Sequence, residues 1–148
     1  MIFNLAVFCR FLAEVRGRKK TDGRKAVMIM VYSLYGGGAE RVAAILASAL
    51  SENYSVSVVC YEKKTEMYSL REGVNVFFLP RFRGAEKNVR RLEAFLMKRV
   101  KKMLGIKASV SFMYAMNSLN VKSAAGDAVI CSERNNPVKR EPDRKSVV

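Results

Sequence analysis

The sequence has no histidine and only three prolines among its 148 residues. Without histidine, a Ser-His or Cys-His nucleophilic pair is excluded. Because histidines and paired cysteines are the usual zinc ligands, we expect no metal site. With half of the residues hydrophobic and so little proline, the composition predicts a folded domain with a proper core and not a disordered chain.

Cysteine and long apolar runs are also scarce. Cys9, Cys60 and Cys131 are odd in number and far apart, which is typical of reduced thiols in a cytoplasmic protein. The apolar start, MIFNLAVF, ends at Cys9 and falls well short of the roughly 20 residues that span a bilayer. Its basic residues follow it, so it does not resemble a signal peptide. Residues 1–25 are therefore expected to form a basic extension, either poorly ordered or lying as a helix on the inner membrane surface.

Acidic residues are outnumbered by basic ones, 13 against 27, which gives a formal net charge of +14. A domain this basic is attracted to polyanions such as phosphorylated ligands, anionic membranes or nucleic acids. The basic residues are not interleaved with aromatics as in RNA-binding motifs, so we expect no nucleic-acid partner.

From Ala26 onwards, strand-like and helix-like segments alternate. Five segments read as strands: AVMIMVYS (26–33), SVSVVCY (55–61), GVNVFFLP (73–80), ASVSFM (108–113) and AVICS (128–132). The first is a continuous apolar run, which is typical of a parallel strand covered on both faces. Helical segments separate them: residues 39–52 with an apolar face, a basic amphipathic helix from Glu86 to Gly105, and residues 117–126. The sequence therefore predicts the α/β class: a Rossmann-like parallel sheet of about five strands with helices on both faces.

In the two longer helices, the apolar spacing predicts which side faces the sheet. The first should bury Val42, Ile45, Leu46, Ala49 and Leu50. The second should bury Val89, Leu92, Leu96, Val100 and Met103, with its basic residues, Lys101 among them, around the rest.

Three glycines, Gly36, Gly37 and Gly38, follow the first strand and lead into a helix. In an open α/β sheet, ligands bind at the carboxyl ends of the strands, and a helix amino terminus offers free N–H groups to a phosphate. A tight turn explains one or two glycines. Three in a row favour close approach of a ligand to the backbone.

Two common phosphate-binding motifs fit poorly. The nucleoside-triphosphate loop needs Gly-Lys-Ser/Thr, whereas Ala39, Glu40 and Arg41 follow the glycines. In the dinucleotide fingerprint, Arg41 stands where a third glycine is needed, although Glu62 imitates the ribose-binding acid. A NAD-dependent oxidoreductase domain therefore stays only as an alternative.

The segments GGGAERV (36–42), SFMYAMN (111–117) and SERNNP (132–137), in this order, resemble the amino-terminal domain of GT-B glycosyltransferases of family four. The resemblance covers roughly residues 27–142. It implies a retaining, metal-independent enzyme that transfers a sugar from a nucleotide-sugar, a substrate and not a cofactor, to a glycan or lipid-linked acceptor in surface polysaccharide or glycolipid synthesis.

The resemblance also implies roles for single residues. Gly36, Gly37, Gly38 and Arg41, together with Arg134 and Asn135, would face the donor diphosphate and the acceptor. Glu133 stands where many relatives carry a catalytic histidine, and it would orient a sugar hydroxyl or form a structural ion pair with Arg134. Ser111 and Asn117 would contact the acceptor, although a strand-end serine and a helix cap are the simpler interpretation.

The same resemblance sets the expected domain boundaries. Residues 26–142 would be the acceptor-side domain, and the second, donor-binding domain is absent from this sequence. DRKSVV (143–148) has no apolar periodicity and does not follow the family pattern, so we expect it to be a non-native tail. By itself the chain is expected to be inactive.

The basic helix from Glu86 to Gly105 has two interpretations. It could present an ordinary solvated face, or hold a peripheral protein on an anionic membrane at about 1 kcal/mol for each Lys or Arg near the surface. A non-catalytic basic module that binds membrane or another polyanion is thus the main alternative to the enzyme.

Overall fold

The computed structural model describes residues 5–18, 22–63, 68–82 and 84–134. Its centre is a single sheet of parallel strands in the order β3-β2-β1-β4-β5, which confirms the predicted fold class. The strands are β1 (Ala26–Val31), β2 (Ser55–Cys60), β3 (Asn75–Phe78), β4 (Ile106–Phe112) and β5 (Ala128–Ser132).

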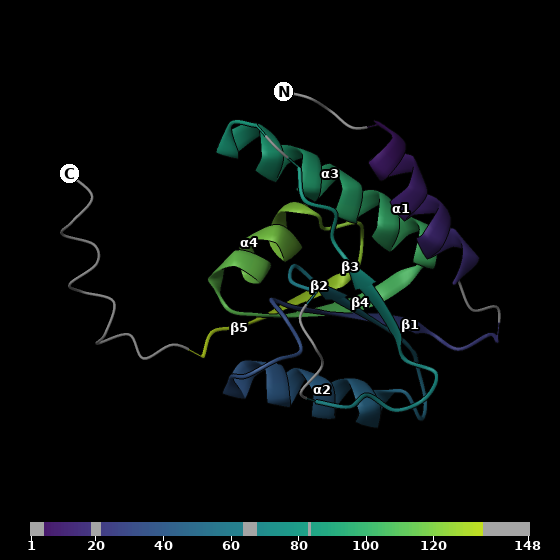
Figure 1. Cartoon of the computed structure of the whole chain (residues 1–148). Helices are drawn as coiled ribbons and strands as arrows, with labels where there is room; N and C mark the ends of the chain where they lie inside the picture. The colour runs from purple at the N-terminus through teal and green to yellow at the C-terminus, as the bar shows by residue number, and fades with distance from the viewer. Residues whose placement is uncertain (1–4, 19–21, 64–67, 83, 135–148) are drawn as a thin grey trace, which may run out of the picture.

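Helices cover both faces of this sheet, as predicted. They are α1 (Leu5–Gly17), α2 (Gly38–Leu50), α3 (Glu86–Leu104) and α4 (Tyr114–Lys122). In Figure 1, α2 lies below the sheet, whereas α1, α3 and α4 lie above it. The chain therefore changes faces between the helix that follows β1 and the helices that border β4.

Two apolar cores follow from this layering, because successive side chains of a strand point to opposite faces. Met28 and Met30 of β1 enter the core beneath α1, α3 and α4. Ile29 and Val31, their neighbours in the strand, enter the core against α2. β1 lies in the middle of the sheet, and its last four residues are buried.

Helix α1 packs into the core that it shares with α3 and α4, which the sequence of residues 1–25 did not lead us to expect. Phe8, Phe11 and Val15 are buried on one side of the helix. The rings of Phe8 and Phe95 stack with centroids 6.4 Å apart, and Phe11 meets Phe77 edge to face at 6.4 Å. Among the described residues, no helix is long and apolar enough to cross a membrane.

The predicted apolar face of α2 is wrong in part. Ile45 is 59% exposed and Ala49 is exposed as well. The helix instead buries four alanines: Ala39, Ala43, Ala44 and Ala47. Small side chains let the helix approach the sheet closely, so the larger Val42 and Leu46 lie at the margins, half-buried.

In α3, the predicted end is confirmed and one predicted surface residue is not. Gly105 follows the helix with φ 65°, a left-handed conformation that suits glycine. Lys101, predicted on the charged side, is 1% exposed, and Glu93 is 8% exposed. Both make polar contacts inside the protein, Lys101 with Asp127 and Glu93 with Tyr61.

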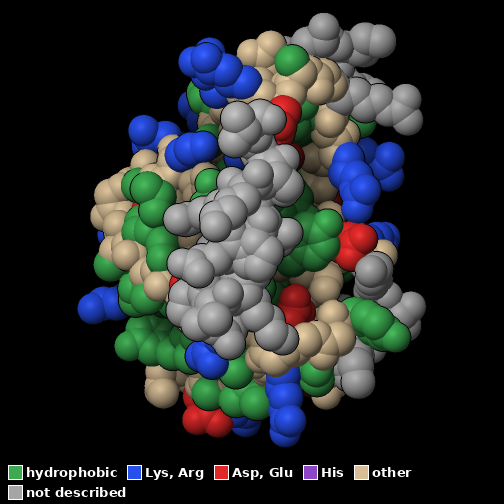
Figure 2. Space-filling view, turned by 90° about the vertical axis from the view of Figure 1, so that its left-hand side faces the viewer, with side chains coloured by type: hydrophobic (Ala, Val, Ile, Leu, Met, Phe, Trp, Pro, Cys, Tyr) green, Lys and Arg blue, Asp and Glu red, His purple; other side chains and the backbone are tan. Residues whose placement is uncertain are grey.

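The excess of positive charge is spread over the surface shown in Figure 2. Lys and Arg side chains occur there at several separate places around the rim of the visible face, with fewer acidic ones between them. On this face, the net charge therefore does not form one continuous basic patch.

Candidate functional site

The carboxyl ends of β1 and β4 lie side by side, since these strands are neighbours in the sheet. The chain leaves β1 for α2 on one face and leaves β4 for α4 on the other (Figure 1). Such a switch point opens a crevice in which ligands of open α/β sheets bind. The candidate site is therefore built from the loops that follow β1, β2 and β4.

The predicted glycine turn lies at this edge and is exposed. Gly36 has φ 95°, so the backbone itself requires glycine there. Gly37 precedes the helix as its N-cap residue, and Gly38 begins α2. The Tyr68 hydroxyl donates to the Gly36 carbonyl at 2.5 Å, which holds the turn against the loop that follows β2.

Space around the turn differs from one glycine to the next. A Cβ on Gly37 would lie 2.5 Å from Oε2 of Glu40, whose side chain folds back over the turn. A Cβ on Gly38 would meet nothing within 4 Å. Gly38 is thus required neither by its backbone conformation nor by a neighbour, and its open side is free for a ligand. Arg41 is exposed one turn into the helix, with its N–H bonded to the Gly37 carbonyl.

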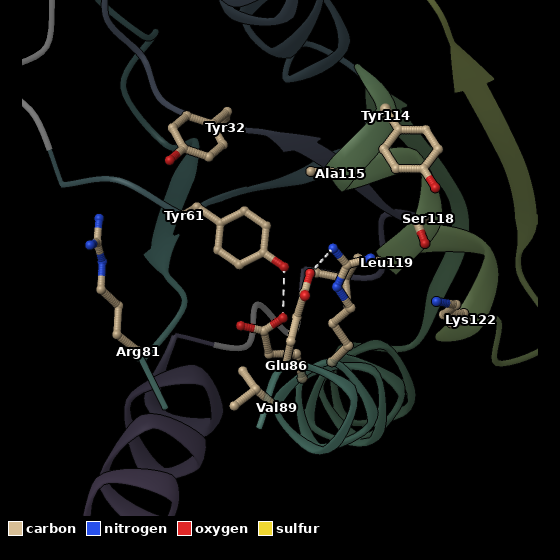
Figure 3. Close-up of a pocket in the computed structure, with 12 residues that line it drawn as sticks. Tyr32, Tyr61, Arg81, Glu86, Val89, Tyr114, Ala115, Ser118, Leu119 and Lys122 are labelled. Carbon is tan, nitrogen blue, oxygen red and sulfur yellow. Dashed lines mark hydrogen bonds and ion pairs between the residues drawn. The ribbon is translucent and has the colours of Figure 1, made fainter. Parts of the chain in front are cut away.

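A cavity of about 330 Å³ opens on the α3 and α4 side of the same edge (Figure 3). Three tyrosines line it near the ends of strands. Tyr32 and Tyr61 directly follow β1 and β2, and Tyr114, separated from β4 by one residue, begins α4. Tyr114, Ser118 and Lys122 line it from α4, and Glu86, Arg90 and Glu93 line it from α3. The cavity therefore spans the switch point between β1 and β4.

The best-defined contact in the cavity joins Tyr61 to Glu93. The Tyr61 hydroxyl donates to Glu93 Oε2 at 2.8 Å. Burial raises the pKa of Glu93, although the Tyr61 hydrogen bond and the Arg90 charge oppose the shift. Burial and the adjacent Glu93 carboxylate also raise the pKa of Tyr61 far above its usual value. Tyr61 therefore remains a hydrogen-bond donor at neutral pH.

Three basic side chains surround the cavity. Arg90 pairs with Glu86 one turn earlier in α3. Arg81 lies 3.9 Å from Glu62, a loose pair. Lys122, at the end of α4, makes no ion pair with any other residue that the structure describes. The rim of the cavity thus carries cations, whereas Glu93 lies deeper.

Ser111 and Asn117 contact each other, and Ser111 is buried whereas Asn117 is half-buried. The Ser111 hydroxyl donates to Asn117 Oδ1 at 2.8 Å and has no exposed surface. Asn117 Nδ2 donates to the Ser132 carbonyl at 3.3 Å, which ties α4 to the end of β5. Asn117 is not the helix cap, since Met113 precedes α4. In this conformation Ser111 is buried and hydrogen-bonded to α4.

The loop after β5 is described only as far as Arg134. Glu133 and Arg134 are both exposed. The Arg134 guanidinium lies 5.8 Å from the centroid of the Phe112 ring, a cation–π contact with β4. Asn135, predicted beside them, lies outside the described residues, as do residues 143–148.

The cavity was missed in the sequence, although a signal for it exists. Each of its three tyrosines stands at the end of a predicted strand, and the ends of parallel strands meet at one edge of a sheet. Glu93 gave no such signal, since one carboxylate in a charged helix looks like a surface residue. In the part of the chain that the structure covers, no cluster of three or more His, Cys, Asp or Glu side chains could hold a metal ion.

The similarity to glycosyltransferases depends on the three short segments and on the order in which they occur. No model of a known protein family matches the sequence, and no curated protein matches it either. What is established is the fold: a Rossmann-like parallel sheet with a crevice at its switch point.

Proposed function

We propose that this chain is the acceptor-side half of a retaining, metal-independent glycosyltransferase, which moves a sugar from a nucleotide-sugar to a glycan or lipid-linked acceptor. One observation carries the proposal: a cavity with tyrosine walls lies at the sheet's switch point, at the same edge of the sheet as an exposed glycine turn that begins α2 on the other face. The order of the three segments that resemble family-four enzymes supports it independently.

In this proposal the two parts of the edge have different roles. The amino terminus of α2 carries partial positive charge and free N–H groups, which suit the donor's diphosphate. The open side of Gly38 lets that group approach the backbone. The cavity receives the acceptor sugar, because aromatic rings pack against the faces of sugar rings while polar groups select hydroxyls.

Transfer breaks the bond between the sugar's anomeric carbon and the phosphate oxygen and forms a bond to an acceptor oxygen, whose proton passes to the departing diphosphate. Arg41 and Arg134 would offset the charge on the departing diphosphate. Enzymes of the resembling family assemble their cleft from two domains. In this proposal, sugar transfer needs both domains, whereas acceptor binding needs only the cavity.

The experiment begins with the gene, read past the codon for Pro142, and continues with the protein that the whole reading frame encodes. A second Rossmann-like domain and transfer of radiolabelled sugar from a nucleotide-sugar to a glycolipid extract are expected. Gly38→Val should abolish transfer, because its side chain fills the open space at the turn, whereas Ile45→Val, on the exposed side of α2, should not. A frame without a second domain, or thermal protection by NAD with no sugar transfer, would contradict the proposal.

A second function, docking on an anionic membrane, is favoured by one surface. Phe95 is 54% exposed in the middle of α3, among basic side chains. Its ring stacks on Phe8 of α1, whose neighbours Leu5 and Val7 are 59% and 37% exposed. The surrounding cations on α3 are Lys87, Arg90, Arg91, Lys98, Arg99 and Lys102. Apolar groups inside a ring of cations are typical of interfacial membrane binding.

Sedimentation with vesicles tests this second function. The chain should bind vesicles containing phosphatidylserine, release them at high salt, and bind several-fold more weakly as Phe95→Ser. The control is Ile45→Ser on α2, which is 59% exposed but lies on the opposite side of the sheet. Equal binding by both variants would show that the α3 surface is not the docking site.

A further inference from the structure

The cavity contains a carboxylate held in a particular way. Glu93 is 8% exposed, and one of its oxygens, Oε2, accepts the hydrogen bond from Tyr61. For the other oxygen, Oε1, there is no hydrogen-bond partner among the described residues. Every enclosed polar side-chain atom in the described chain does have a partner. Oε1 is therefore reached by solvent, and Glu93 lines the cavity.

The surrounding groups limit what Oε1 can bind. Arg90 is already paired with Glu86, so it does not neutralise Glu93 through a direct ion pair. Tyr61 fixes the position of the carboxylate by a hydrogen bond that only a protonated hydroxyl can make. The remaining oxygen is an acceptor that calls for a donor from the ligand, such as a hydroxyl group.

The aromatic walls of the cavity limit the shape of the ligand. The rings of Tyr32 and Tyr61 lie with centroids 5.9 Å apart and an interplanar angle of 49°, and both border the cavity. Its volume of about 330 Å³ is near the lower limit of ligand pockets, about 300–1,000 Å³. A small ring with an apolar face and hydroxyl donors at its edge fits such a space.

We infer that the cavity binds one neutral pyranose ring, one hydroxyl of which donates to Glu93 Oε1 while the ring packs against Tyr61 and Tyr32. The inference rests on the proposed function, of which it names the acceptor class at this position: an uncharged sugar residue. Glu93 is thus a specificity-determining residue, and Tyr61 is the positioning residue that holds its carboxylate.

Tyrosine fluorescence offers a direct test, because the chain has six tyrosines and no tryptophan. The 148-residue chain is titrated with methyl α-glycosides of glucose, galactose and mannose, and with tetrahydropyran-2-methanol, a related ring that lacks the ring hydroxyls. At least one glycoside should change the fluorescence saturably, and the tetrahydropyran should not. Glu93→Gln should weaken that binding at least fivefold. Glu72→Gln, an exposed carboxylate in the turn before β3, should leave it unchanged.

Tyr61→Phe separates positioning from folding. The variant keeps the ring and loses only the hydroxyl, so the glycoside should bind more weakly while circular dichroism and the melting temperature stay near those of the wild type. Titration with glucose 1-phosphate tests whether the cationic rim binds an anion instead. The inference is overturned if glucose 1-phosphate binds, no neutral glycoside binds, and Lys122→Gln abolishes the binding of glucose 1-phosphate.

The remaining outcomes distinguish the two proposals. No glycoside binding, with sugar transfer by the protein of the complete reading frame, would overturn the inference and leave the proposed function standing. Glycoside binding that depends on Glu93, without sugar transfer by the complete protein, would support the inference and overturn the proposed function. Binding that is equal in the wild type, Glu93→Gln and Glu72→Gln would overturn the role of Glu93.

Discussion

Lys101 Nζ lies 2.9 Å from Asp127 Oδ2, and neither side chain has exposed surface. The ammonium also donates to Asn120 Oδ1 at 2.6 Å and contacts Ser109 Oγ at 3.2 Å. Asn120 continues the chain of contacts to Ser111 at 3.1 Å. A buried polar network therefore joins α3, β4, α4 and the loop before β5, and it reaches Ser111 near the carboxyl end of β4.

Removal of one partner of this pair should be costly, because the other charge is left buried without compensation. We expect Lys101→Ala to lower the free energy of unfolding by about 3–5 kcal/mol. The neighbouring Lys102→Ala, at an exposed position of the same helix, should stay within about 0.5 kcal/mol. Urea unfolding measures the stability of both variants. Equal losses of unfolding free energy would show that the buried Lys101–Asp127 pair contributes no more than an exposed lysine.

Asp127 should make stability depend on acid. Burial raises the pKa of Asp127, but the hydrogen bonds from Ser109 and Lys101 outweigh it and hold the pKa below its usual 3.8. A lowered folded-state pKa stabilises the protein above the unfolded value, and this contribution is lost as the pH falls through the folded one. The difference in unfolding free energy between wild type and Asp127→Asn should therefore be constant near pH 7 and shrink below pH 3.8. A difference independent of pH would contradict this.

Glu93 should make the stability of the fold depend on pH in the opposite direction. Burial raises its pKa above the usual 4.5, so its ionised form destabilises the folded chain. As the pH falls from 7 towards 4.5, the wild type should gain stability relative to Glu93→Gln. Thermal melts of both proteins across this range give the comparison. A wild type that loses stability relative to the variant on acidification would show that the carboxylate is favoured in its charged form.

Substitutions in the glycine turn should distinguish a glycine required by its backbone conformation from one that only leaves open space. Gly36→Ala places a side chain at φ 95° and should cost about 1–3 kcal/mol. Gly38→Ala lies in helix with open space and should be neutral or stabilising by up to about 1 kcal/mol. Chemical denaturation measures the two variants side by side. Equal destabilisation would mean that Gly38 also has a structural role.

Continuous apolar runs in the sequence were sufficient to predict the sheet. Apolar runs bounded by turn residues predicted all five strands, and β5 matches at both ends because AVICS is short and sharply bounded. Gly105 predicted the end of α3 because a left-handed cap favours glycine. The apolar face of α2 was predicted less well, since hydrophobic size misleads where alanines allow the closest contact with the sheet.

The site was harder to predict because its contacts join distant segments. Tyr61 and Glu93 are 32 residues apart, and Lys101 and Asp127 are 26 apart. In a helix with so many charges, nothing local marks Glu93 and Lys101 as the ones that turn inward. The role of Gly38 also depends on the open space beside it, which only the structure reveals.

Sugar binding at the carboxyl edge of the sheet can be tested directly. The most direct measurement is a nitrogen-15 chemical-shift map of the chain during titration with methyl hexopyranosides. We expect shifts confined to the amides of Tyr32, Tyr61, Glu93 and Tyr114, with the residues around them. Shifts confined to the α1 and α3 surface around Phe95, or none at millimolar sugar, would contradict it.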